Sequence, residues 1–152
     1  MLFRSLMCLM FSPQVVDEII GRARGVAPDI IAGTLLARSD SPLVVVAHRL
    51  LPPVSSTRCR SQITPREYLD AEREARDSGY RLVGTYPSHP GGPAEPSALD
   101  FEDARPGLCI LIVDVGEKSA DATAWILSPD GESLVPMELR QCAHEQHAPV
   151  DQ

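Results

Sequence analysis

Three polar residues between positions 89 and 100 are of types that carry chemistry in proteins. His89 lies in the segment GTYPSHP at residues 84–90, eight residues before Ser97 and eleven before Asp100. Proteins use imidazole, hydroxyl and carboxylate groups for proton transfer and, in the case of imidazole and carboxylate, for binding metals. This stretch is therefore the first candidate for a functional site.

The same residues also fit a structural interpretation. Ser97 and Asp100 have the spacing of a capping box, in which the serine accepts hydrogen bonds from backbone amides and the helix dipole favours the aspartate. His89 fits an ordinary hydrogen-bonded loop histidine as well as a metal ligand. From the residues alone, both interpretations stay open.

Two further groups of residues could bear on such a site. His48 ends an apolar run and is typical of a structural histidine, although it could contribute a ligand if it faced the pocket. Cys142, His144 and His147 lie in a polar tail, and their spacing matches no standard zinc pattern.

Helices and strands that would position these residues can be read from capping residues and periodicity. Ser12-Pro13 predicts a helix start, and Gly25 with Pro28 predicts its end. A second helix should begin at the capping box of Thr64 to Glu67 and end near Ser78-Gly79. A short third helix should begin at Ser97 and stop before Pro106.

Apolar runs predict the strands. Residues 30–37 and 43–48 form a predicted hairpin, and further strands are expected at 58–63, 80–86, 108–115 and 122–127. Residues 135–139 are predicted to be a last, edge strand. The polar tail that follows is expected to be loosely held.

Composition indicates one folded domain and excludes several classes of partner. The 152 residues are 43% hydrophobic and carry a formal net charge of -7, so nucleic acid is not an expected partner. The apolar part of residues 1–11 is too short for a secretion signal, and no stretch reaches the roughly 18 residues of a membrane span. Four scattered cysteines indicate reduced thiols and a cytoplasmic location.

Residues 84–90 followed by PSALD at residues 96–100 resemble the signature of the JAMM/MPN (JAB domain) metalloproteases, Gly-x-x-His-Ser-His-Pro and then Pro-Ser-x-x-Asp. The order of helices and strands is also similar, over residues 11–140. The resemblance implies an α/β (α+β) fold, a curved and mostly antiparallel sheet flanked by helices, related to cytidine deaminases. Residues 1–10 would be an added strand or extension, and residues 141–152 a tail.

The resemblance also implies a zinc site, which this sequence does not complete. In active relatives two histidines and the aspartate hold zinc, and His89 and Asp100 match two of these positions, while Ser97 matches the serine that aids the oxyanion. The first histidine position holds Pro87, and the general-base glutamate position holds Ile30. Asp29 is adjacent, but one step along a strand turns a side chain to the opposite face.

Two functional hypotheses follow from the resemblance. In the first, the chain is a pseudoenzyme that binds the extended tail of a partner, such as a ubiquitin-like or sulfur-carrier protein, without cutting it. In the second, it is an active zinc-dependent peptidase or isopeptidase in which His48 supplies the third ligand and Asp29 or a partner residue is the base. A third use of the pocket, through Tyr86, Ser88 and His89, has no support from their spacing.

Overall fold

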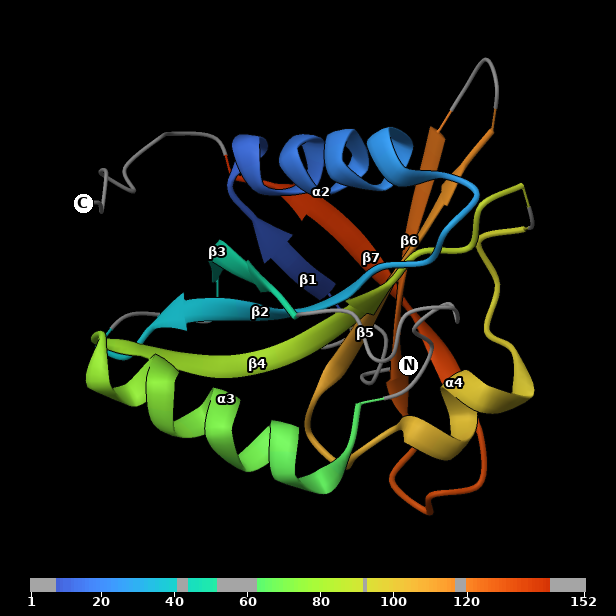
Figure 1. The fold of residues 1–152 in the computed structure, drawn as a ribbon. Coiled ribbons are helices and arrows are strands. Elements are labelled where there is room, and N and C mark those ends of the chain that lie inside the picture. The colour runs from blue at the N-terminus through green and yellow to red at the C-terminus, as the bar shows by residue number, and fades with distance from the viewer. Residues whose placement is uncertain (1–7, 41–43, 52–62, 92, 117–119, 143–152) are drawn as a thin grey trace.

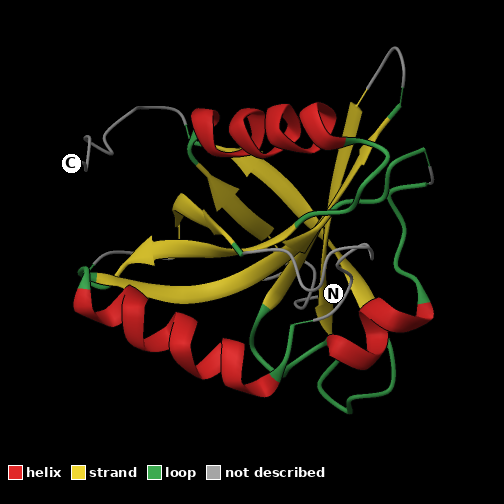
Figure 2. Cartoon of the chain, viewed as in Figure 1, coloured by secondary structure: helices red, strands yellow, loops and turns green. Residues whose placement is uncertain are grey.

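The computed structural model describes residues 8–40, 44–51, 63–91, 93–116 and 120–142. These residues form seven strands and three helices (Figures 1 and 2). In chain order the elements are β1 (Cys8–Phe11), α2 (Pro13–Val26), β2 (Ala32–Arg38), β3 (Val44–Leu50), α3 (Pro65–Asp77), β4 (Tyr80–Pro87), α4 (Ala98–Asp103), β5 (Cys109–Val115), β6 (Ala120–Leu127) and β7 (Leu134–Gln141).

The strands form one closed barrel in the order β1-β3-β2-β4-β5-β6-β7. Four ladders are antiparallel, namely β2 with β3, β2 with β4, β5 with β6 and β6 with β7. The short β1 is parallel to both β3 and β7, and this pairing closes the barrel. Figure 1 shows α2 and α3 on opposite sides of the sheet. The expected α/β fold with a curved, mostly antiparallel sheet flanked by helices is confirmed.

The helices begin where the sequence predicts. Ser12 has the extended backbone of an N-cap residue, and Pro13 occupies the first helical position of α2. In α3, Thr64 and Glu67 form both hydrogen bonds of a capping box. No helix among the described residues is long and apolar enough to cross a membrane.

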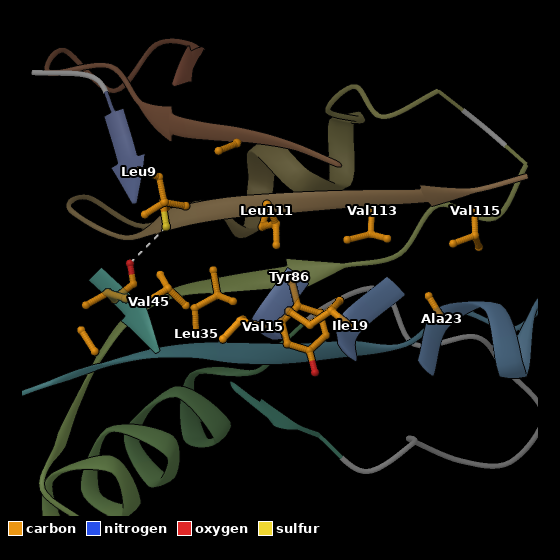
Figure 3. Packing of buried hydrophobic residues seen from close by; sticks show 14 residues of the cluster. Leu9, Val15, Ile19, Ala23, Leu35, Val45, Tyr86, Leu111, Val113 and Val115 are labelled. Carbon is orange, nitrogen blue, oxygen red and sulfur yellow. Dashed lines mark hydrogen bonds between the residues drawn. The ribbon is translucent and has the colours of Figure 1, made fainter. Parts of the chain in front are cut away.

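The main core lies between α2 and the barrel strands. Val15, Ile19 and Ala23 are spaced four residues apart, so they share one face of α2, and all three are buried. They pack with Leu111 and Tyr86 in one cluster, which Figure 3 shows. The cluster therefore fixes α2 against strands that are distant in sequence.

Two glycines allow close approaches within this core. A Cβ atom at Gly33 would overlap the ring of Tyr86, which lies opposite it in the β2–β4 ladder. A Cβ atom at Gly84 would likewise overlap Cys109 of β5. The thiol of Cys109 donates to the Val83 carbonyl, and burial raises its pKa to about 12. Both glycines are thus required by packing.

One strand prediction is wrong and others fall on undescribed residues. Residues 135–139 are not an edge, because β7 pairs with β6 through its first half and with β1 through its second half. The pairing involves residues about 130 positions apart, which no local pattern encodes. The strand expected at 58–63 lies almost wholly outside the described residues, as does the tail after Cys142.

Candidate functional site

The segment that carries His89 is held between two strands by its backbone. After β4 ends, the Ser88 amide donates to Ile31 O at 3.0 Å, and the Ile31 amide donates to Ser88 Oγ at 2.9 Å. Ser88 also forms an isolated parallel bridge with Val113 of β5. The amide of His89 then donates to Val113 O on β5 at 2.7 Å. His89 therefore has a fixed backbone position.

Asp100 is positioned by the cap of α4. The Ser97 amide donates to Asp100 Oδ2 at 2.8 Å, and the Asp100 amide donates to Ser97 Oγ at 3.2 Å. This is the capping box that the sequence predicts, and it leaves Ser97 exposed. Asp100 is the buried residue of this six-residue helix, so its carboxylate points into the protein.

His89 and Asp100 contact each other directly. His89 Nε2 lies 3.1 Å from Asp100 Oδ2, and the side chains are only 19% and 6% exposed. The hydrogen bond to Asp100 raises the pKa of His89, and the charge of Asp114 adds to this. Burial opposes ionisation of Asp100, yet the bonds from His89 and Ser97 hold the pKa of its carboxyl below the usual value. Both shifts favour an imidazolium–carboxylate pair.

The second nitrogen of His89 supports the same protonation state. His89 Nδ1 lies 3.3 Å from the carbonyl oxygen of Pro93. A carbonyl only accepts, so Nδ1 carries a proton, and Nε2 either carries one toward Asp100 or offers its lone pair to a cation. Metal-binding histidines are commonly oriented in this way, with the other nitrogen bonded to a carbonyl or carboxylate.

The donor set does not fit a catalytic zinc ion. Three protein ligands are needed, but in the part of the chain that the structure describes no three His, Cys, Asp or Glu side chains lie close enough to share a metal. Pro87 lines a small pocket beside Asp100, with a cavity volume of about 10 Å³, which is room for about one water molecule. Pro87 has no side-chain donor, so it offers no third ligand to this wall of the pocket.

The position that the resemblance assigns to the general base holds Ile30. Ile30 is half-buried, and the neighbouring Asp29 is exposed. Neither has a place in the His89–Asp100 pair, whose hydrogen bonds involve other residues.

His48 is bonded elsewhere. Its Nδ1 lies 3.1 Å from Tyr86 Oη and its Nε2 lies 3.1 Å from Glu18 Oε1 of α2. Burial lowers the pKa of His48. In the neutral form Nε2–H donates to Glu18, and Nδ1 accepts from the fully buried phenol of Tyr86. The residue is a satisfied structural histidine that ties α2 to β3 and β4.

Sequence reasoning missed the side chains that support the pair. On β6, the Thr123 hydroxyl donates to Ala94 O in the segment that follows His89, and the indole N–H of Trp125 donates to Thr123 Oγ1. At the end of α4, the phenol of Tyr68 donates to Asp103 O at 3.3 Å, and the Arg105 guanidinium lies 4.0 Å from the centre of the same ring. None of these residues belongs to a short motif, so only the alternation of Thr123 and Trp125 on one strand face could have indicated them.

Comparison with known proteins identifies the family of the chain. Residues 12–128 match the family model of prokaryotic homologs of the JAB domain. The comparison with curated proteins gives no significant match.

Solved structures of similar shape span nearly the whole chain. A solution structure of a Desulfitobacterium hafniense protein is 25% identical with a TM-score of 0.71, covering 91% of this chain and 96% of that one. A Salinibacter ruber protein, also solved in solution, is 28% identical with a TM-score of 0.68, covering 95% and 97%. The crystal structure of a JAB1/MPN domain protein from Archaeoglobus fulgidus is 23% identical with a TM-score of 0.54, covering 88% and 100%, and supports the fold alone.

Proposed function

The chain belongs to the family of prokaryotic homologs of the JAB domain, and from this premise we propose that it binds the extended tail of a partner protein without cutting it. The JAMM/MPN proteins that the chain resembles act on such tails, namely the Gly-Gly ends of ubiquitin-like or sulfur-carrier proteins. The chain would act as a pseudoenzyme, a binding domain that keeps the family's shape. It would do so without the family's catalytic zinc.

One observation carries this proposal: His89 and Asp100 pair with each other, while Pro87 lines the pocket next to Asp100. An imidazolium–carboxylate pair satisfies both groups without a metal. A zinc ion held by two side chains would be weakly bound, and loss of the general base would by itself cost on the order of 10²–10⁴ in rate. Under this proposal the chain lacks two parts of the family mechanism, the third zinc ligand and the general base.

The edge of β3 supports binding of an extended peptide. β1 pairs with β3 only at Val44 and Val45, whereas residues 47–50 are paired with β2 alone among the described residues. Arg49 and Leu50 at the end of this strand are exposed, Leu50 by 38%. Backbone groups along such an edge can accept an added strand, and a Gly-Gly tail has no side chains to obstruct it.

Two measurements test the proposal. Elemental analysis of the purified protein should find no stoichiometric zinc, and a fluorescent peptide ending in Gly-Gly should bind in an anisotropy titration. Leu50→Asp, at the edge, should weaken binding about tenfold or more, whereas Leu69→Asp, at a leucine of α3 that is 59% exposed, should not. Stoichiometric zinc that disappears in His89→Ala, or no peptide binding at millimolar protein, would overturn it.

The orientation of His89 favours one alternative, a zinc-dependent peptidase or isopeptidase. Its Nδ1 is bonded to the Pro93 carbonyl and its Nε2 faces Asp100, as in many metal-bound histidines. Under this alternative Ser97 would aid the oxyanion, and a partner protein would supply the missing donor and base, since both ring nitrogens of His48 are already bonded. Cleavage of a tail-linked substrate that stops with a chelator and in His89→Ala would establish this function.

A further inference from the structure

The segment between β4 and α4 is attached to two different strands. Its first half follows β5 through backbone bonds, with His89 N to Val113 O at 2.7 Å and Gly91 N to Val115 O at 3.3 Å. Its second half contains Pro93, whose carbonyl bonds to the His89 ring, and Ala94, which is only 8% exposed. The second half is attached to β6 by a side chain.

That side chain is Thr123. Its hydroxyl donates to the carbonyl of Ala94 at 2.5 Å and accepts from the indole N–H of Trp125 at 2.8 Å. An indole N–H can only donate and a carbonyl can only accept, so the single proton of the threonine hydroxyl must point to Ala94. Trp125 thereby sets the direction of the threonine hydrogen bond.

Packing reinforces this attachment. Ala94 is clustered with Ile110 and Ile112 of β5, and Trp125 packs against the same cluster. Alternation along β6 puts Thr123 and Trp125 on one face, which is the face that meets the segment. The carbonyl of Pro93 is one peptide away from the carbonyl that Thr123 holds, so its position follows from the same contact.

We infer that Thr123, directed by Trp125, is a positioning residue that fixes the Pro93–Ala94 peptide and through it the ring orientation of His89. The side chain touches neither His89 nor Asp100 in any hydrogen bond of the described residues; it acts through the carbonyl that bonds to Nδ1. The inference deepens the site on which the proposed function rests. The hydrogen bond at Nδ1 of His89 can be measured without a bound peptide or metal.

The test is an NMR measurement of the His89 ring protons in the metal-free full chain at one fixed pH, about one unit below the ordinary histidine pKa. The unmodified protein should show a slowly exchanging proton on Nδ1 of His89, because that proton is bonded to Pro93. Thr123→Val keeps the shape and removes the hydroxyl, so this signal should be lost. Thr123→Ser restores a hydroxyl and should restore it.

Thr34 supplies the matched control. It is a buried strand threonine, 1% exposed, and its hydroxyl has no hydrogen-bond partner among the described residues. Thr34→Val should leave the His89 ring signals unchanged. If Thr123→Val fails to fold, Trp125→Phe is the second test, because it removes the indole donor while keeping an aromatic ring against Ala94, Ile110 and Ile112, and it should weaken the Nδ1 signal.

An unchanged Nδ1 signal in folded Thr123→Val, or in Trp125→Phe where that variant decides, would overturn the inference. Peptide anisotropy on the unmodified protein separately reports the proposed function. If the peptide does not bind but the Nδ1 signal is lost in Thr123→Val, the positioning role of Thr123 stands and the proposed peptide binding fails. If the peptide binds but the Nδ1 signal is unchanged in Thr123→Val, the proposed binding stands and the positioning role fails.

Discussion

His89 Nε2 and Asp100 Oδ2 are separated by 3.1 Å, nearly the distance that two ligands of one tetrahedral zinc would have. Zinc bonds of about 2.0–2.1 Å at a tetrahedral angle give a ligand separation of about 3.3 Å. A proton between these two atoms therefore occupies the place that a cation would take. The pair already has a geometry close to that of a metal site, and what it lacks among the described residues is another donor.

Pro87→His should add that donor. The substitution places an imidazole on the wall of the small pocket that Pro87 and Asp100 both line, so a third donor would be added near Asp100 and its partner His89. We expect zinc binding at micromolar concentration or tighter in Pro87→His, measured by competition with a chromogenic chelator, and none in the unmodified protein. Pro87→Ala removes the ring without adding a donor and is the control. Equal zinc affinity in the two variants would refute the expectation.

Asp100→Asn should destabilise the fold by removing the charge from the pair. Hydrogen bonds to charged groups contribute about 1.5–3 kcal/mol, so the urea-derived free energy of unfolding should fall by about that amount. The pKa of His89 is raised by Asp100, so it should move down toward 6.5 in the variant, as NMR titration would record.

The pH dependence of this loss follows from the two shifts. The pKa of His89 is raised, so its contribution is complete below 6.5 and is lost as pH rises through the folded value. The pKa of Asp100 is lowered, so its contribution is complete above 3.8 and is lost as pH falls through the folded value. The stability difference should be largest between these two pH values. Asp17→Asn, at an exposed position on α2, should show no such maximum.

His48 should affect stability with the opposite sign. Burial lowers its pKa, so its contribution is present above 6.5 and is lost as pH falls below 6.5 toward the folded value. Protonation of Nδ1 would also deprive the Tyr86 phenol of its acceptor. We expect His48→Gln to be destabilising at pH 7 and progressively less so on acidification, by denaturant unfolding at several pH values. A difference that grows on acidification would contradict this assignment.

Gly33→Ala should destabilise the barrel. The added methyl would overlap the buried ring of Tyr86, and overpacking of this kind costs about 1–3 kcal/mol. The same substitution at Gly21, an exposed glycine of α2 with open space around its α-carbon, should stabilise by about 0.5–1 kcal/mol. The unfolding temperatures of both variants are compared with that of the unmodified protein. If Gly33→Ala and Gly21→Ala shift the unfolding temperature in the same direction, the contact with Tyr86 does not account for the effect at Gly33.

Much of the fold could be predicted because its local elements carry their own boundary residues. Ser12 with Pro13 and Thr64 with Glu67 begin helices for reasons that lie within a few residues of chain. The closure of the barrel could not be predicted, because the match of β1 to β7 depends on backbone hydrogen bonds between two short strands with no matching sequence pattern. Residues 135–139 were for this reason predicted to be an edge.

The sequence motif predicted which side chains of the candidate site lie close together. The resemblance implied that His89 and Asp100 lie together, and their side chains are in contact at 3.1 Å, whereas their role stays a prediction. The support from Thr123 and the phenol bound to His48 could not be found in this way, since a threonine or tyrosine on a strand looks the same whether or not its hydroxyl has a distant partner. Only tertiary contacts distinguish these cases.

The closing of the barrel by β1 and β7 also constrains when the protein can fold during synthesis. Leu9 of β1 is synthesised about 130 residues before its ladder partner Leu139. At roughly 5–20 residues per second, the apolar segment Cys8–Phe11 waits many seconds for the strand that completes its pairing. Nascent chains of this protein should therefore be most dependent on chaperones just before β7 leaves the exit tunnel.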